Sequence, residues 1–243
     1  MFNVQKLVHG EGGFDLLETS QTTALSTLVD YAYQNIRQEI ITEALPADAK
    51  INLNDLCSRY QISPTPIKQA LNRLIAEGLV DNIPRRGFRV HTVSWKEVDE
   101  MLEMRIMYEL YFAEQATNAV RSDPSLQSKF EENLDVNMRL IEECSSTEEY
   151  FQVYEQDRQF HKLLIYAGGN SVAVRTYESL NTHAYAIYIY GRQPREETIN
   201  GILEHRAIFE AMRDGDSERV HEHIKRHIEN ARGKIHTFLK AEH

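Results

Sequence analysis

Apolar side chains recur at helical spacing through the first third of the chain. Over Thr23–Glu43 they return at steps of three and four residues, which predicts an amphipathic helix that Pro46 ends. A shorter helix is expected over Asn52–Tyr60. A third begins at Thr65, after a serine hydroxyl that can cap it and among prolines that suit a first turn, and Gly78 lies just past its end. The expected buried stripe of the first helix comprises Leu25, Leu28, Val29, Ala32, Ile36 and Ile40.

The pattern changes to that of strands after the third helix. Leu79–Ile83 and Phe88–Val93 are β-prone, and the segment Pro84-Arg85-Arg86-Gly87 between them is a turn signal, so a two-stranded hairpin is expected. Residues 1–22 have no sustained period and read as a peripheral N-terminal arm. The first folded domain is therefore expected over residues 23–93, in the order helix, helix, helix, hairpin.

From residue 94 onward the chain reads as helical almost without interruption. Ser94-Trp95-Lys96-Glu97 matches a capping box at the start of the first of these helices. No strand pattern occurs, so an all-helical bundle over residues 94–240 is predicted. The fold class is mostly α. The expected helices are Ser94–Arg121, Ser125–Cys144, Thr147–Ala167, Ser171–Tyr190, Arg195–Arg213 and Asp216–Leu239.

Composition narrows the class of protein. With 42% hydrophobic residues, the chain of 243 residues can bury one or two globular cores. No apolar run is long enough for a membrane span and Met1–Gly13 lacks a signal pattern, so no membrane association and a cytoplasmic location are expected. Cys57 and Cys144 have no CxxC spacing, which excludes a disulfide framework and a thiolate zinc finger.

Charge separates the two predicted domains. The formal net charge of −10 argues against a chain that binds polyanions over its whole surface. Residues 93–243 carry 18 basic and 27 acidic side chains, whereas Arg59–Arg89 contains six basic and two acidic ones. A small cationic segment thus precedes a large anionic one.

Two short helices and a hairpin with arginines at its tip are the parts of a winged helix-turn-helix, whose second short helix enters the major groove of double-stranded DNA. We expect Gln69 to read a base and Lys68 to contact phosphate or guanine, while the wing arginines grip the backbone or the minor groove. The alternative is that this helix face is merely solvated. The predicted DNA contacts are Asn54, Thr65, Lys68, Gln69, Asn72, Arg73, Arg85, Arg86 and Arg89.

These residues carry a family resemblance. Ile62–Leu74 (ISPTPIKQALNRL), followed by Glu77–Val80 and Arg86–Val90, resembles the DNA-binding domain of GntR-family bacterial transcription regulators. Members of that family usually have Arg in place of Pro64 and Arg-Glu in place of Lys68-Gln69. The resemblance therefore implies a DNA-binding regulator whose operator differs from the family's commonest sequence.

The anionic domain contains candidate metal ligands. Asp157 and His161 lie four residues apart on one helix face, and later helices carry His205 and His227. Three imidazoles and one carboxylate suit Zn²⁺, Ni²⁺ or Mn²⁺ and leave a position open for a ligand oxygen. Alone, an i,i+4 acid–His pair is weak support for a metal site, and His223 can replace His227 as a ligand.

A second resemblance covers residues 94–239. Met104–Glu109, the Asp157-x3-His161 pair, and His205–Asp216 continuing to His227 are similar to the FadR C-terminal, or FCD, domain, in its VanR-type six-helix branch. The resemblance implies a divalent metal held by the Asp and three His named above, which helps to bind a small organic acid. Arg105 either pairs with that acid or forms a salt bridge to Glu109.

The sequence thus predicts a transcriptional regulator, expected to be a repressor, that binds operator DNA as a homodimer and responds to a small organic acid at a divalent metal. Two alternatives stay open. In a metal sensor the ion itself is the signal. A metal-dependent hydrolase or lyase needs a general base that no motif supplies, and would have no use for an arginine wing, so we expect no enzyme.

Overall fold

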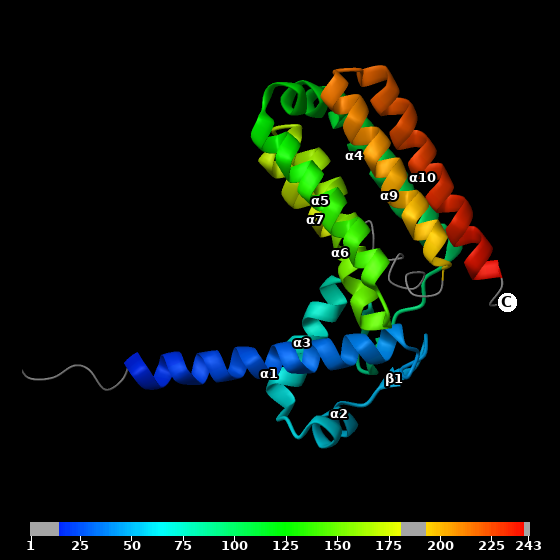
Figure 1. Cartoon of the computed structure of the whole chain (residues 1–243). Helices are drawn as coiled ribbons and strands as arrows, with labels where there is room; N and C mark the ends of the chain where they lie inside the picture. Colours follow the sequence, from blue (N-terminus) through cyan, green and yellow to red (C-terminus); the bar gives the residue numbers. More distant parts are fainter. Residues whose placement is uncertain (1–14, 181–192, 241–243) are drawn as a thin grey trace, which may run out of the picture. The chain divides into compact units, whose positions relative to one another are not determined.

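The computed structural model of the chain describes residues 15–180 and 193–240, and it divides into two compact units, Met1–Val90 and His91–His243. The division falls three residues before the boundary expected from the sequence. Each unit is described by itself. The first contains α1 (Asp15–Ile41), β1 (Lys50–Ile51), α2 (Leu53–Tyr60), α3 (Pro64–Ala76), β2 (Val80–Ile83) and β3 (Gly87–Val90) (Figure 1).

Helix α1 is longer than the sequence predicted. It begins at Asp15 rather than Thr23, so residues 15–22 of the expected arm are helical, and residues 1–14 lie outside the described part of the chain. The expected stripe was partly wrong, because Leu28 is 42% exposed and Tyr33 is buried instead. Helix α1 packs on α3, and its buried residues include Ala32, Tyr33, Ile36 and Ile40, whereas the side chain of Leu25 lies outside the described part of the chain.

Helices α2 and α3 form the helix-turn-helix. Asn52 caps α2 as predicted, since its Oδ1 accepts the backbone N–H of Asn54 at 3.0 Å. Ser63 is the N-cap residue of α3, but its side chain makes no capping hydrogen bond. Pro64 and Pro66 occupy the first turn, and Pro66 lacks one of the two N–H groups that the serine hydroxyl could accept, which leaves only that of Thr65.

The wing is a three-stranded antiparallel sheet in the order β1-β3-β2. The hairpin of β2 and β3 was predicted, and it pairs Val80 with Val90 and Ile83 with Gly87. Strand β1, which pairs Lys50 with Arg89, was missed. Its two residues are too few to show an alternating pattern, and only pairing with β3 makes them a strand.

The second unit is helical throughout its described residues, and all six predicted helices are present there. Helix α7 is described as far as Leu180, and the predicted continuation to Tyr190 lies outside the described residues. Figure 1 shows α9 and α10 side by side along α4, and α4 also packs on α6. The helices are α4 (Trp95–Ser122), α5 (Pro124–Glu143), α6 (Thr147–Ala167), α7 (Ser171–Leu180), α9 (Arg195–Asp214) and α10 (Ser217–Lys240).

The helix starts differ in detail from the sequence prediction. Ser94 caps α4 by accepting the N–H of Glu97 at 3.2 Å, but the Glu97 carboxylate contacts His91 rather than closing a capping box. A complete box, which the sequence analysis did not identify, joins Ser146 and Glu149 at the start of α6. Phe130, on α5, lies 5.4 Å and 5.7 Å, centroid to centroid, from two aromatic rings of α6 and α9, which form the centre of the core.

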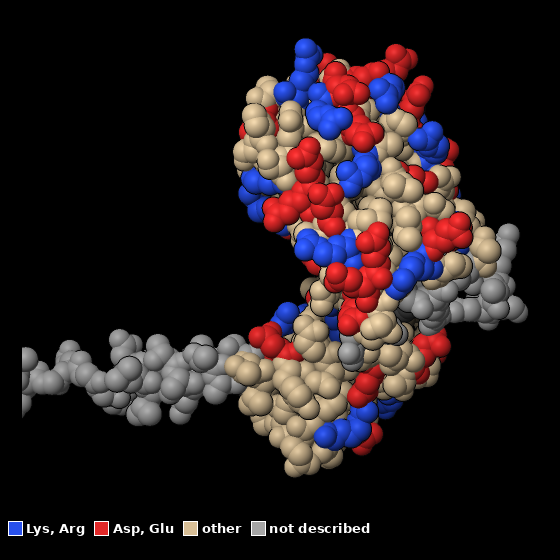
Figure 2. Space-filling view, in the orientation of Figure 1, with Lys and Arg blue, Asp and Glu red and all other residues tan. Residues whose placement is uncertain are grey.

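Acidic and basic side chains are interspersed over the visible face of the helical unit (Figure 2). Ion pairs join exposed side chains of this unit, such as Arg206 with Asp135 at 2.9 Å. Within the described ranges 15–180 and 193–240, no helix is both long enough and apolar enough to cross a membrane.

Candidate nucleic-acid interface and candidate metal centre

Helix α3 divides its side chains between the core and solvent. Ile67, Ala70 and Leu71 are completely buried, so the polar residues between them are directed outward. Its first turn begins with proline, whose fixed φ suits a helix start, and has no side-chain cap. Thr65, Lys68, Gln69, Asn72 and Arg73 are all exposed, and so is Asn54 on α2.

Two of the predicted DNA contacts already have partners within the first unit. Arg73 forms an ion pair with Asp30 and stacks on the ring of Tyr33, with the guanidinium 4.0 Å from the ring centroid. Arg89 forms an ion pair with Asp48 at 2.7 Å. Contact with DNA through either arginine would therefore have to compete with an existing ion pair.

The tip of the wing is an unusual turn. The N–H of Arg86 donates to the carbonyl of Ile83 at 2.9 Å, with Pro84 as the second residue of the turn. Arg85 follows it with a φ of 64°, the position where such a turn ordinarily takes glycine or asparagine. Arg85 and Arg86 are exposed, and neither side chain forms an ion pair or hydrogen bond with the described residues.

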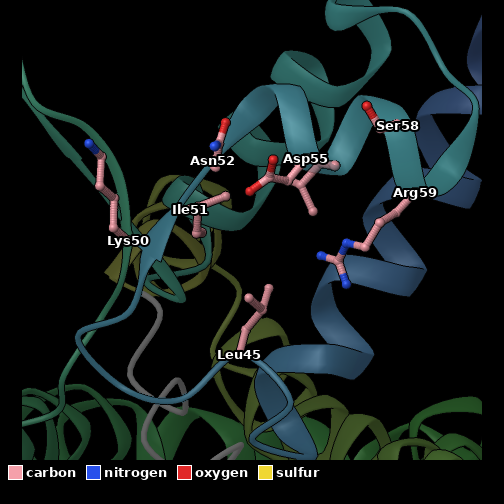
Figure 3. Close-up of a pocket in the computed structure, with 8 residues that line it drawn as sticks. Leu45, Lys50, Ile51, Asn52, Asp55, Ser58 and Arg59 are labelled. Carbon is pink, nitrogen blue, oxygen red and sulfur yellow. The ribbon is translucent and has the colours of Figure 1, made fainter.

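A pocket of about 450 Å³ opens in the same unit between the loop after α1, strand β1 and helix α2 (Figure 3). Leu45, Ile51 and Leu56 line it with apolar atoms. Its polar lining includes Arg59, whose charge is already paired with Glu39 at 2.9 Å. Lys50 and Asp55 also line it and carry opposite charges, so the pocket adds little net positive charge to the domain.

The helical unit brings three of the predicted metal ligands together. His161 of α6, His205 of α9 and His227 of α10 are all buried, at 0%, 0% and 5% exposure. Nε2 of His205 lies 3.0 Å from Nε2 of His161 and 3.1 Å from Nε2 of His227. Two nitrogens that bind one ion at about 2.1 Å are about 3.0 Å apart at the right angle of an octahedral site and about 3.4 Å apart at a tetrahedral angle. With all three ligand atoms within 4.8 Å of one another, the cluster is compact enough to hold one divalent ion.

The fourth predicted ligand lies near this cluster but outside its closest contacts. Oδ1 of Asp157 is 3.7 Å from Nε2 of His205, and its side chain is 16% exposed. His223, the alternative to His227, instead contacts Arg226 on the exposed side of α10. The described residues thus bring together the three histidines that were chosen from the sequence, with the aspartate beside them.

The electrostatics of the cluster favour neutral imidazoles. Burial lowers the pKa of His161 well below its ordinary value, and the nearby Arg105 and the two other imidazoles lower it further. Burial, His227 and Arg105 lower the pKa of His205 in the same way. Burial and Arg105 lower the pKa of His227 to about 3. At neutral pH all three rings therefore have a lone pair available for a metal ion.

Arg105 forms the salt bridge that was one of the two alternatives raised by the sequence. Its Nε donates to Oε1 of Glu109 at 3.0 Å, which is the expected salt bridge. Its Nη2 also lies 2.7 Å from Nε2 of His161, so the guanidinium reaches the histidine cluster. Arg105 is 2% exposed and Glu109 is completely buried, which leaves this cation inside the helical unit.

Two carboxylates at the cluster were not identified from the sequence. Glu109 faces Nδ1 of His161 at 3.0 Å, and Glu204 faces Nδ1 of His227 at 2.8 Å. Glu204 lies one residue before His205, and Glu109 lies four residues after Arg105. Their proximity to the histidines depends on packing between different helices, so no local sequence motif predicts it.

A winged helix-turn-helix, joined to a helical unit with a buried histidine cluster, is the architecture of a DNA-binding regulator. Residues 28–90 match the model of the bacterial regulatory proteins of the gntR family, and residues 100–230 match that of the FCD domain. The chain belongs to the GntR-family transcriptional regulators that carry an FCD domain.

Relatives across nearly the whole chain support this assignment. YdhC of Bacillus subtilis, an HTH-type transcriptional regulator, is 26% identical over 198 residues, which cover 81% of this chain and 85% of YdhC. The transcriptional repressor RspR of Escherichia coli is 22% identical over 197 residues, which cover 81% of this chain and 84% of RspR. McbR/YncC of E. coli has the same fold, with a TM-score of 0.66 at 18% identity, over 87% of this chain and 98% of that protein.

Proposed function

We propose that this regulator is a homodimeric repressor whose operator affinity is controlled by a small organic acid bound at a divalent metal ion. The observation that carries the proposal is the meeting of three buried imidazole nitrogens, from α6, α9 and α10, at separations of 3.0 and 3.1 Å. All three histidines offer ligand atoms within 4.8 Å of one another, and we interpret their convergence as the ligand set of one cation. His161, His205 and His227, with Asp157 beside them, would hold it.

The charges around the cluster support an anionic effector. A divalent ion and Asp157 together carry one formal positive charge, while Arg105 and Glu109 neutralise each other. Glu204 lies beside His227 but is 20% exposed, so water screens its charge. When bound, the ion supplies a positive charge inside a largely water-free interior, where a carboxylate is attracted strongly.

For DNA binding, the proposal assigns the first role to those predicted DNA-contacting cations whose side chains have no partner within the described residues. These are Lys68 on α3 and Arg85 and Arg86 at the wing tip. Thr65, Gln69, Asn72 and Asn54 are exposed beside or near them and can donate to bases or phosphates. We assign Arg73 and Arg89 a structural role first, because each is engaged in an ion pair.

Homodimerisation follows from the operator geometry of this class of reading head. One helix-turn-helix contacts a single half-site, and two heads on a palindrome multiply affinity through effective concentration. The sedimentation coefficient of the full chain at micromolar concentration tests this part of the proposal. A monomer that still binds operator DNA with full affinity would contradict it.

The decisive experiment titrates operator affinity with metal and with acid separately. Electrophoretic mobility shifts on the protein's own promoter are measured with the chelated protein, with Zn²⁺, Ni²⁺ or Mn²⁺ alone, and with metal plus candidate sugar acids or dicarboxylates. We expect the affinity to change when an acid is added to the metal-loaded protein. A full response to metal alone would identify a metal sensor instead, and no response to either would refute the proposal.

In the same assay, variants test the roles of the two units separately. Lys68→Ala and Arg86→Ala should each weaken operator binding while the helical unit keeps its metal. His161→Ala should abolish metal retention and the effector response, but leave basal DNA binding largely intact. Unchanged operator affinity in both Lys68→Ala and Arg86→Ala would contradict the assignment of the reading head.

A further inference from the structure

Glu109 is a completely buried carboxylate in the middle of α4. Its Oε1 accepts hydrogen bonds from Nε of Arg105 at 3.0 Å and from the hydroxyl of Tyr177 at 2.9 Å. Its Oε2 lies 3.0 Å from Nδ1 of His161. A buried carboxylate is costly without such donors, so this set fixes both its position and the roles of its two oxygens.

The neighbours of His161 decide which of its nitrogens carries the proton. A neutral imidazole has one N–H and one lone pair. The carboxylate of Glu109, paired with Arg105, only accepts, so it requires the proton on Nδ1. Nη2 of Arg105 lies 3.1 Å from Nδ1 and 2.7 Å from Nε2, so this donor does not choose between the two nitrogens. The carboxylate of Glu109 therefore selects the tautomer, with the lone pair on Nε2, the atom that faces His205.

We propose that Glu109 is a positioning residue for the metal ion: it holds His161 in the tautomer and orientation in which Nε2 can bind the ion. This inference rests on the proposed metal site. Partners of this kind raise the affinity of a metal for its histidine ligands by orienting the ring and fixing its proton. Because Glu109 belongs to α4 and also binds Tyr177 of α7, it connects the ion to both helices.

The two carboxylates at the cluster differ in how replaceable they are. Glu204 faces Nδ1 of His227 at 2.8 Å in a similar way, but it is 20% exposed, so water can take over its role. Glu109 is completely buried, and no solvent reaches Nδ1 of His161 to replace it. Substitution of Glu109 should therefore have the larger effect on the ion.

Glu109→Gln gives a specific prediction because glutamine has one oxygen and one NH₂ group. The oxygen is retained where two donors converge, beside Arg105 and Tyr177, and the NH₂ group then faces Nδ1 of His161. That NH₂ group only donates, so Nδ1 must accept and the imidazole proton moves to Nε2. Nε2 then has no lone pair for a metal ion.

The test reads the tautomer and the metal separately. In the metal-free full-length protein with ¹⁵N-labelled histidine, long-range ¹H–¹⁵N spectra distinguish the two tautomers, and the signal lost in His161→Ala assigns the ring. We expect Nδ1–H in the wild type and Nε2–H in Glu109→Gln. Competition with a chromophoric chelator should show a loss of about 10- to 100-fold in Zn²⁺ affinity.

Glu100→Gln is the matched control. It is the same chemical change on the same helix, but at a side chain that is 62% exposed. It should alter neither the tautomer of His161 nor the affinity for zinc. An Nε2–H tautomer in the wild type would overturn the inference, and this result is available even if Glu109→Gln does not fold.

The zinc measurements separate this inference from the proposed function. Wild-type protein that binds zinc no more tightly than Glu109→Gln overturns the role of Glu109 and leaves the metal site intact. Wild-type protein that binds none of Zn²⁺, Ni²⁺ and Mn²⁺ overturns both. A tautomer change together with weakened zinc binding in Glu109→Gln supports the inference, because a residue needed only for packing would not move the proton.

Discussion

At Arg85, on the wing tip, the effect of backbone strain on stability can be measured separately from the effect of the positive charge on DNA binding. With a φ of 64° this residue adopts the left-handed conformation, which costs most residues about 1 kcal/mol. Asparagine tolerates this conformation, whereas alanine is as strained there as arginine. Asparagine would therefore be more stable than arginine at this position. A residue that costs stability in this way is typical of a side chain that serves binding.

We predict that Arg85→Asn and Arg85→Ala weaken operator binding equally but differ in stability. Each removes one positive charge, and loss of one phosphate contact lowers the salt slope of binding by about 0.9 for each wing that touches DNA. At physiological salt this corresponds to a loss of about fivefold in affinity per wing. Arg85→Asn should be about 0.5 to 1 kcal/mol more stable than Arg85→Ala, because only alanine retains the strain.

Fluorescence anisotropy of a labelled operator between 50 and 200 mM salt, combined with urea unfolding of the first unit, measures both quantities. A fall in slope of about 1.8 would indicate two engaged wings, as a dimer on a palindrome requires. The reasoning is refuted if the salt slope is unchanged in both variants, or if Arg85→Asn is no more stable than Arg85→Ala.

Three other predictions concern charges inside the two units. Arg73→Ala should lower the stability of the first unit by about 1 kcal/mol, because the ion pair with Asp30 and the stack on Tyr33 are lost. It should weaken operator binding less than Lys68→Ala does. A larger loss of operator affinity in Arg73→Ala than in Lys68→Ala would place Arg73 on the DNA. In the metal-free protein the free energy of unfolding should fall as the pH drops below 6.5 towards 3, because the folded state holds the pKa of His227 at about 3 while the unfolded chain takes up the proton. The free energy should change by up to about 1.4 kcal/mol per pH unit for each such histidine. Urea titrations that give equal stability at pH 7 and pH 5 would contradict this prediction. Adding Zn²⁺ at about 100 times its Kd should stabilise the helical unit by about 2.7 kcal/mol in calorimetry, an effect that His205→Ala should abolish and that Glu100→Gln should leave unchanged.

The architecture could be predicted from the sequence because it depends on local chemistry. Apolar spacing, proline and glycine positions, and the arginine turn are short-range signals, and they were sufficient for the described helices and for the β2–β3 hairpin. Helix boundaries were less well determined: α1 begins at Asp15, and Leu28 is exposed although it fits the apolar period. The spacing of apolar residues along α1 predicts one face of the helix, but the packing of α3 against it decides which part of that face is buried.

The histidines were also available from the sequence, since residue type and a family resemblance were enough to choose them. Their surroundings were not. The tertiary structure decides that Nε2 of His205 lies 3.0 Å from Nε2 of His161, that Asp157 lies slightly outside this cluster, and that Arg73 is held in an ion pair. Glu109 shows the difference most clearly, because its role depends on His161, 52 residues away, and on Tyr177, 68 residues away. Contacts between helices are set by how whole faces pack together, and a linear pattern of residue types carries no direct record of them.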